Sequence, residues 1–303
     1  MKVSIVMTYY RRIRELKNTL SSFRETKHND FEVIVVDDGT WDGEHDSRPI
    51  IEEFKDIDIK LIRVDPDDKW WPNPSIPFNI GFNKASGEKI ILQNAECFHN
   101  GDIISHTANN LKENKYFTYG CYSLTRHVTD LLIGGTEEIK QKIKNLDGLP
   151  DAIFQGGMPG TLGWYNHSIH RPEHFHFCAA ISTKDLNDLG GGFDERYAHG
   201  LCWDDNEFKT RIKKKGMEQV FVDNPFVFHQ FHYNYSSNQD LNWAKRPLIL
   251  TDNKNVYHST TDKETDTKVN IGDKRREVYF KNEEWLEDMK KYYSKFPKTG
   301  YES

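Results

Sequence analysis

The segment Phe31–Thr40 reads FEVIVVDDGT, and it sets the fold expected for the whole chain. The apolar run from Phe31 to Val36 has the length of a buried strand, and Asp37-Asp38-Gly39 ends it with a turn. The neighbouring segments repeat this pattern, with amphipathic stretches between them. Further strands are predicted at Val3–Met7, Ile59–Val64 and Ile90–Leu92, and helices at Arg12–Phe23, Pro49–Phe54 and Pro77–Ala85. Strands that alternate with helices predict an α/β fold, with a mostly parallel central sheet and helices on both faces.

Polar residues follow two of these strands. Asp37-Asp38 ends the second strand, and Asn94-Ala95-Glu96 ends the fourth. In parallel sheets, ligands bind beyond the carboxyl ends of the strands. We therefore expect both strand ends to converge on one crevice.

The remaining two thirds of the chain are less regular. Residues 115–240 are rich in Gly, His and aromatic residues, and Asp204–Lys215 is predicted as a helix with carboxylates first, lysines last and Gly216 behind it. We divide the chain into a domain at 1–240, with a nucleotide-binding half at 1–100 and an acceptor-binding and catalytic half at 101–240, and an extension at 241–303. The extension is predicted as a loop around Asn253–Asp273 and a terminal helix at Glu283–Tyr293.

Composition excludes several classes of protein. A net charge of −6 over 303 residues argues against nucleic-acid binding. Four cysteines without a CxxC pair favour a reducing compartment over a disulfide framework or zinc knuckle. No stretch approaches the ~20 apolar residues of a membrane span. Because a strand pattern starts at Val3, no room is left for a signal peptide, and we expect a cytoplasmic protein.

Five segments in this order resemble the family 2 glycosyltransferases of the GT-A fold, over roughly the first 235 residues. They are SIVMTYYRR at 4–12, FEVIVVDDGT at 31–40, FNIGFNKASGEKIILQNAE at 78–96, GGFDERYAHGLCWDDNEFKTRI at 191–212 and FVFHQFHY at 226–233. The resemblance implies a nucleotide-sugar donor, most often a UDP-sugar, a glycan acceptor, and a divalent cation, Mn²⁺ or Mg²⁺, on the donor diphosphate.

The resemblance places the donor at the first and second strand ends. It implies that Asp38 contacts the base or ribose with support from Asp37, that Thr8 and Tyr9 wall the base pocket, and that Asn94 and Ala95 lie beside the ribose. Asp37 and Asp38 are also compatible with a simple turn at the end of a strand.

The same resemblance implies a metal site at Glu96. The family's Asp-x-Asp pattern reads Asn94-Ala95-Glu96 in this chain, so one formal charge is missing, and a site that has lost its metal is the alternative. His229 is the implied second ligand, preferred over His232.

The register of WDDNEF makes Asp205 the implied catalytic base, since Arg211 follows it by six residues, and Asp204 its acidic neighbour. Simple capping of the helix is the alternative. Trp203 is expected to stack on the acceptor, and Arg171 and His176 are expected to face the acceptor or the diphosphate. A zinc site formed by His167, His170, His174 and His176 is disfavoured, because their spacing fits no common ligand pattern.

These expectations define an inverting, metal-dependent glycosyltransferase that uses Asp205 as general base. The rival is a non-catalytic carbohydrate- or nucleotide-sugar-binding protein on a degenerate transferase scaffold, supported by Asn94. A nucleotidyltransferase is a third reading, but Tyr9-Tyr10-Arg11-Arg12 stands where its glycine-rich loop belongs.

Overall fold

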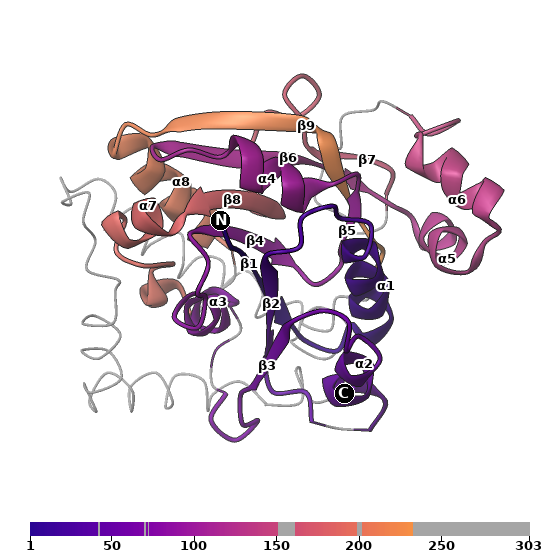
Figure 1. Cartoon of the computed structure of the whole chain (residues 1–303), viewed down its shortest axis with the longest axis horizontal. Helices are drawn as coiled ribbons and strands as arrows, with labels where there is room; N and C mark the ends of the chain where they lie inside the picture. Colours follow the sequence, from indigo (N-terminus) through magenta and orange to yellow (C-terminus); the bar gives the residue numbers. More distant parts are fainter. Residues whose placement is uncertain (42, 70, 72, 151–160, 199–201, 233–303) are drawn as a thin grey trace, which may run out of the picture.

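The computed structural model describes residues 1–41, 43–69, 71, 73–150, 161–198 and 202–232 (Figure 1). Its strands are β1 Val3–Tyr9, β2 Phe31–Asp37, β3 Ile59–Arg63, β4 Lys89–Asn94, β5 Cys97–Asn100, β6 Lys115–Ser123, β7 Gly163–Asn166, β8 Cys178–Ser182 and β9 Glu218–His229. Its α-helices are α1 Ile13–Phe23, α2 Ser47–Glu52, α3 Ser75–Phe82, α4 Ile103–Asn110, α5 Arg126–Gly134, α6 Glu137–Lys144, α7 Thr183–Asp188 and α8 Asp204–Lys214. The predicted loop and helix of the C-terminal extension lie outside the described residues.

The described strands form one sheet in the order β3-β2-β1-β4-β8-β6-β9-β5, with β7 paired to β6. The first four strands are parallel, and their register pairs Tyr9 with Asp37 and Thr8 with Asn94. The strand β8 then runs antiparallel to both β4 and β6. The parallel half confirms the alternation predicted from the sequence, and it brings the ends of β1, β2 and β4 to one edge.

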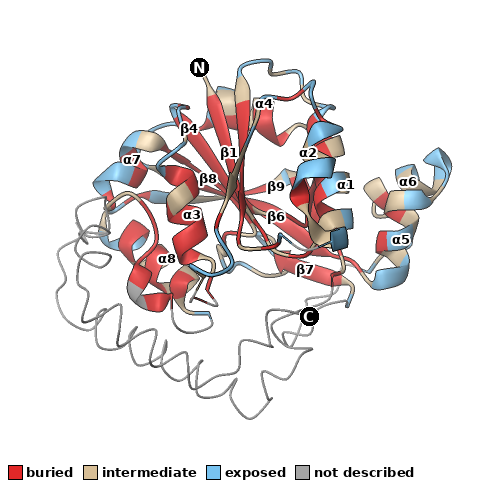
Figure 2. Ribbon diagram, turned by 90° about the horizontal axis from the view of Figure 1, so that it is seen from below, coloured by how far each residue is buried: buried red, intermediate tan, exposed pale blue. Residues whose placement is uncertain are grey.

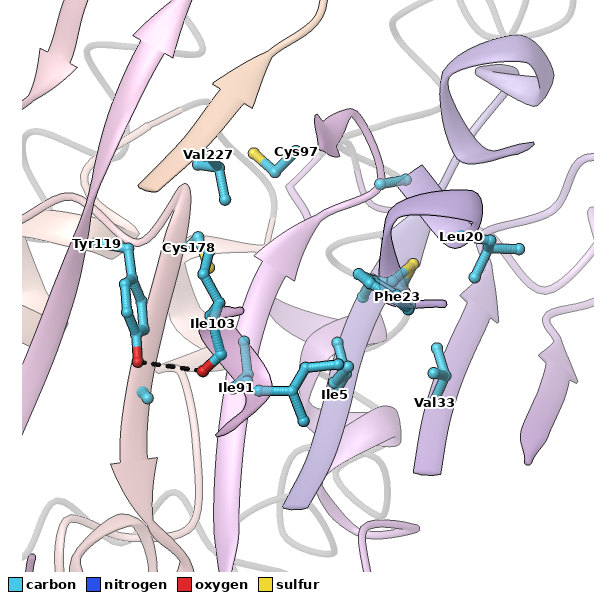
Figure 3. Close-up of a cluster of buried hydrophobic side chains, with 14 of the residues drawn as sticks. Ile5, Leu20, Phe23, Val33, Ile91, Cys97, Ile103, Tyr119, Cys178 and Val227 are labelled. Carbon is cyan, nitrogen blue, oxygen red and sulfur yellow. Dashed lines mark hydrogen bonds between the residues drawn. The ribbon is translucent and has the colours of Figure 1, made fainter. Parts of the chain in front are cut away.

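Two hydrophobic clusters cover the two faces of this sheet, and Figure 2 shows that its central strands are buried. Alternate residues of β2 serve different faces: Val33 and Val35 pack with α1, whereas Ile34 and Val36 pack with α3. A strand buried on both faces needs a continuous apolar run, which explains the composition of this segment. Figure 3 shows the first cluster, where the Tyr119 hydroxyl donates to the Ile103 carbonyl at 3.5 Å.

The helices α5 and α6 lie at one side of the molecule, next to β7 (Figures 1 and 2). Their apolar side chains, including Leu132 and Ile143, form a third cluster with Trp164, Phe226 and Phe228. Among the described residues, no helix combines the length and the apolarity that crossing a membrane requires.

Candidate functional site

Asp37, at the end of β2, is engaged entirely by the protein. One carboxylate oxygen accepts from the backbone N–H and hydroxyl of Thr40 at 2.9 and 2.5 Å, and the other accepts from Ser47 at 2.5 Å. Burial raises the pKa of Asp37 against the opposing effect of these donors. Asp37 therefore holds the turn after β2 and the start of α2 in place.

Asp38 points to a different set of partners. Its two carboxylate oxygens accept from Lys69 Nζ at 2.5 Å and from Trp71 Nε1 at 2.9 Å. Lys69 also lies 4.1 Å from the centre of the Tyr10 ring. Burial raises the pKa of Asp38 and lowers that of Lys69, although each opposes the shift of the other. The end of β2 thus carries an acceptor, a cationic donor and an aromatic ring together.

Two of the residues predicted at this edge have buried side chains. Tyr9 is fully buried in the core, with its hydroxyl donating to the His45 carbonyl at 2.6 Å, whereas the ring of the next residue, Tyr10, lies beside Lys69. Ala95 is also fully buried. Thr8 and Asn94 stay partly exposed on adjacent strands.

Glu96 occupies the turn between β4 and β5 and is only 1 % exposed. Its Oε1 lies 3.3 Å from His229 Nε2 and 3.5 Å from His232 Nε2, while its Oε2 accepts from Arg12 Nη1 at 2.6 Å. Burial alone would raise the pKa of Glu96, but Arg12 and the two histidines hold it well below its ordinary value. Glu96 is therefore an ionised carboxylate in a cationic setting.

A buried glutamine fixes the geometry of this cluster. Gln230 is fully buried between the two histidines, and both its backbone N–H and its Nε2 donate to the Glu96 carbonyl, at 3.1 and 3.0 Å. The same side chain also bonds Thr19 and Asn18 of α1. The end of β9, the Glu96 turn and α1 are thereby tied together.

The Glu96 cluster fits a divalent cation. The ligand atoms of Glu96, His229 and His232 all lie within 4.8 Å of one another. One carboxylate and two imidazoles suit Mn²⁺ and similar transition metals better than Mg²⁺, which prefers oxygen ligands. The structure brings both His229 and His232 to Glu96, so both histidines are candidate ligands.

A second cluster lies at the start of α8. The side chain of Asp205 is 28 % exposed, and its Oδ1 lies 3.2 Å from His176 Nδ1. Asp204 is 5 % exposed and accepts from Asn73 Nδ2 at 3.0 Å. Asp204 thus faces the protein, and Asp205 is the carboxylate of the pair that solvent reaches.

The pKa values of both aspartates are raised, although both lie at a helix N-terminus, where the helix dipole favours the ionised form. Burial and the charge of Asp205 raise the pKa of Asp204 to about 7, against His176 and Asn73. Burial raises the pKa of Asp205 to about 6, against the effects of Asp204 and Lys209. In this pair desolvation outweighs the helix dipole.

The GGFDE segment, residues 191–195, packs against the cluster formed by His176, Asp204 and Asp205. The Asn79 side chain of α3 accepts from the Phe193 N–H at 2.8 Å and donates to the Phe193 carbonyl at 2.9 Å. A Cβ on Gly192 would lie 2.1 Å from Asn79 Oδ1, so only glycine permits this approach. Glu207 and Arg211 form a buried ion pair at 2.6 Å, and Arg211 donates to the Leu189 carbonyl. These residues of the motif are structural.

The segment before β8 joins the two clusters. The Asn94 N–H at the end of β4 donates to the Phe177 carbonyl at 3.1 Å. His176 faces Asp205, whereas the Phe177 ring packs against the His229 ring with centroids 5.5 Å apart. Consecutive residues of one extended segment thus contact the Asp205 cluster and the Glu96 cluster.

The remaining predicted residues are placed less tightly. Trp203 immediately precedes α8. Both Trp203 (φ 72°) and Cys202 (φ 62°) have left-handed backbones, and such strained residues are typical of functional sites. The Arg171 guanidinium lies 5.9 Å from the Tyr165 ring, which in turn packs on His229. Within the described ranges, His167, His170 and His174 join no group of three potential metal ligands, so the zinc reading gains no support.

Sequence reasoning missed the partners that loops supply. Arg12, Lys69, Trp71 and Asn73 all follow strand ends at this edge of the sheet, which is the signal that points to them. Their contacts with Glu96, Asp38 and Asp204 depend on tertiary packing, which one sequence does not encode by spacing.

Known proteins match this chain in sequence and in fold. The model of the family described as Glycosyl transferase family 2 matches residues 4–187. An uncharacterized glycosyltransferase of Rickettsia felis is 24 % identical over an alignment of 210 residues that covers 63 % of this chain and 31 % of the relative. One from Nostoc sp. is 29 % identical over 96 residues, covering 32 % of this chain and 28 % of the relative. The chain therefore spans about a third of the length of these curated relatives.

Solved structures give the same indication for the fold. Residues 1–349 of TarS from S. aureus, also solved in complex with UDP, match with a TM-score of 0.53. The identity is 16–17 %, and the match covers 87 % of this chain and 74 % of the solved chain. The likeness confirms the predicted α/β fold of the GT-A type.

Proposed function

This chain belongs to glycosyl transferase family 2, and from that premise we propose that it transfers a sugar from a UDP-sugar to a hydroxyl group of a glycan acceptor, with inversion at the anomeric carbon. The observation that carries the proposal is Asp205, a partly exposed carboxylate at the start of α8 whose pKa is raised to about 6. A general base works best when its pKa lies near the operating pH.

The reaction is a single displacement. The acceptor oxygen attacks the anomeric carbon, the acceptor proton passes to Asp205, and the bond between the anomeric carbon and the diphosphate oxygen breaks with its electron pair on the departing UDP. Attack from the face opposite the leaving group inverts the anomeric centre. Asp204, buried beside Asp205, modulates the affinity of Asp205 for the proton, and Trp203 is proposed to stack on the acceptor sugar.

The ends of β2 and β4 support the assignment of the donor. Asp38 offers acceptor oxygens and Lys69 offers N–H donors, the two kinds of group that the edge of a uracil ring requires, and Tyr10 offers a ring face. Thr8 and Asn94 lie on adjacent strands next to this group, where we place the ribose.

We place a divalent cation at Glu96, His229 and His232. When bound, it would neutralise the charge that develops on the departing diphosphate. Arg12 holds the second oxygen of Glu96, so that the first oxygen is directed to the histidines. Arg171, on the neighbouring aromatic cluster, is proposed to contact the diphosphate.

The experiment is a donor screen. The full chain is incubated with UDP-glucose, UDP-galactose, UDP-GlcNAc and GDP-mannose, each with Mn²⁺ or with EDTA, and release of the nucleoside diphosphate is measured. Thermal unfolding with each nucleotide identifies the bound base, since a ligand specific for the folded state raises the melting temperature. Release of UDP with Mn²⁺ supports the proposal. A rise in melting temperature without turnover, in the presence of diverse oligosaccharide acceptors, supports the non-catalytic binding protein that Asn94 suggests.

A further inference from the structure

His176 is a buried titratable group to which the reaction above gives no role. It lies two residues before β8 and is 6 % exposed. Its ring packs edge-on to Phe78 of α3, with centroids 5.7 Å apart, and at 4.8 Å from the ring of Phe193. Both phenylalanines are fully buried, so the orientation of the imidazole is fixed by packing from two elements.

This packing directs one nitrogen at Asp205. His176 Nδ1 lies 3.2 Å from Asp205 Oδ1, within the reach of a hydrogen bond. Burial lowers the pKa of His176 below its ordinary value, so the ring is neutral near pH 7. A neutral imidazole carries one N–H, and a neighbouring carboxylate favours the tautomer that has this proton on Nδ1.

We propose that His176 is a positioning residue: its caged ring presents the Nδ1 proton to Asp205 Oδ1, orients the carboxylate and leaves Oδ2 as the oxygen that takes up the acceptor proton. The inference rests on the proposed function. It replaces the expectation that His176 faces the acceptor directly, because a ring this deeply buried offers little surface to a sugar.

The charged and titratable neighbours of Asp205 come from three elements. Asp204 and Lys209 belong to α8, Tyr116 belongs to β6, and His176 precedes β8. A hydrogen bond with Asp204 and the charge of Lys209, whose Nζ donates to the Glu173 carbonyl, both lower the pKa of Asp205. Tyr116 stays neutral, because burial and Asp205 hold its pKa well above the ordinary value. His176 is the imidazole of this set, and its Nδ1 lies 3.2 Å from Asp205 Oδ1.

The test uses three substitutions of similar size. His176→Phe keeps a ring in the cage but has no donor. His176→Asn keeps a donor, since the amide Nδ2 of Asn superposes on Nδ1 of His. His176→Gln moves its donor to the position of Nε2. The full-length variants are labelled with ¹³C at the aspartate carboxyl carbons and titrated by NMR from pH 4 to 9, and Asp205→Asn assigns the Asp205 signal.

Because a donated N–H stabilises the carboxylate, His176→Phe is expected to raise the proton affinity of Asp205 about tenfold. His176→Asn restores the native titration, and His176→Gln behaves like Phe. The acid limb of the kcat/KM profile for the donor found in the screen moves with the same pattern, while KM for the donor stays unchanged. Identical titration of Asp205 in the native, Phe and Asn proteins would overturn the inference. A native protein without turnover, but with the expected titration pattern, would instead refute only the proposed function.

Discussion

The turn after β4 and the first turn of α8 both carry buried carboxylates, but their surroundings push the protonation of these groups in opposite directions. Glu96 is paired with Arg12 and faces two imidazoles, and its pKa is held well below the ordinary value. Asp204 and Asp205 face each other with few cations nearby, and their pKa values rise to about 7 and 6. A carboxylate that keeps its charge is suited to a cation, whereas one that binds a proton near neutrality is suited to acid–base work.

The largest effect is expected for Asp205→Asn. The amide keeps the shape of the side chain but accepts no proton, so turnover should fall by about 10²–10⁴, as for a lost general base. Affinity for UDP, measured by calorimetry, should be nearly unchanged, because the donor site lies at the ends of β2 and β4. Asp188→Asn, on the exposed end of α7, is the matched control and should leave both quantities alone. Full turnover in Asp205→Asn would show that Asp205 is not the general base.

The next largest effect is expected at Glu96, in the turn after β4. Glu96→Gln leaves two histidines but removes the charged ligand, so Mn²⁺ affinity should fall by more than the about 10–100-fold that loss of an outer-shell partner costs. Isothermal calorimetry of Mn²⁺ into the UDP-saturated protein measures this, with Glu138→Gln on the exposed face of α6 as control. The cluster is a structural ion-pair network if Glu96→Gln leaves Mn²⁺ affinity unchanged and EDTA alters neither donor binding nor turnover.

The sequence predicts the positions of these carboxylates better than it predicts their protonation. The apolar run before Asp37, the Asn94-Ala95-Glu96 turn and the register of Asp204 and Asp205 follow from periodicity and motif spacing, because they depend on neighbours along the chain. What sets the protonation of these groups comes from distant segments: Arg12 reaches Glu96 from the end of β1, and His176 reaches Asp205 from the segment before β8. Burial, too, appears only in the fold, and at Asp204 it outweighs the helix dipole that the sequence suggested.

A smaller effect should appear in stability. The folded state binds a proton at Asp204 more tightly than the unfolded state does, since the pKa rises from 3.8 to about 7. The free energy of unfolding therefore falls as pH increases from about 4 to about 7, and it stays at this lower level above pH 7. Asp204→Asn mimics the protonated acid, can still pair with Asn73, and should stabilise the protein by about 1–3 kcal/mol at pH 8.

Urea unfolding at pH 8 and at pH 4 measures this difference, which should mostly disappear at the lower pH because Asp204 is then protonated in the folded state and partly protonated in the unfolded state. Glu96→Gln should do the reverse and destabilise the protein at pH 8, because the native carboxylate is favoured by its cationic partners. A destabilising Asp204→Asn at pH 8 would mean that the Asp204 charge is compensated in the folded protein, and the contrast between the two sites would be lost.

The smallest and most discriminating effect is expected for Asn94→Asp, which adds a carboxylate two residues before Glu96. The Asn94 N–H that bonds the Phe177 carbonyl belongs to the backbone and survives the change. If the new charge faces the cation, Mn²⁺ affinity should rise about tenfold, as expected for one more charge at a partly screened distance. Asn94→Ala removes the amide without adding charge and should leave Mn²⁺ affinity unchanged. Unaltered Mn²⁺ binding in Asn94→Asp, together with weaker UDP binding in Asn94→Ala, would place Asn94 at the ribose alone. The cationic environment of Glu96 would then need no second carboxylate, because Arg12 and two histidines already define it.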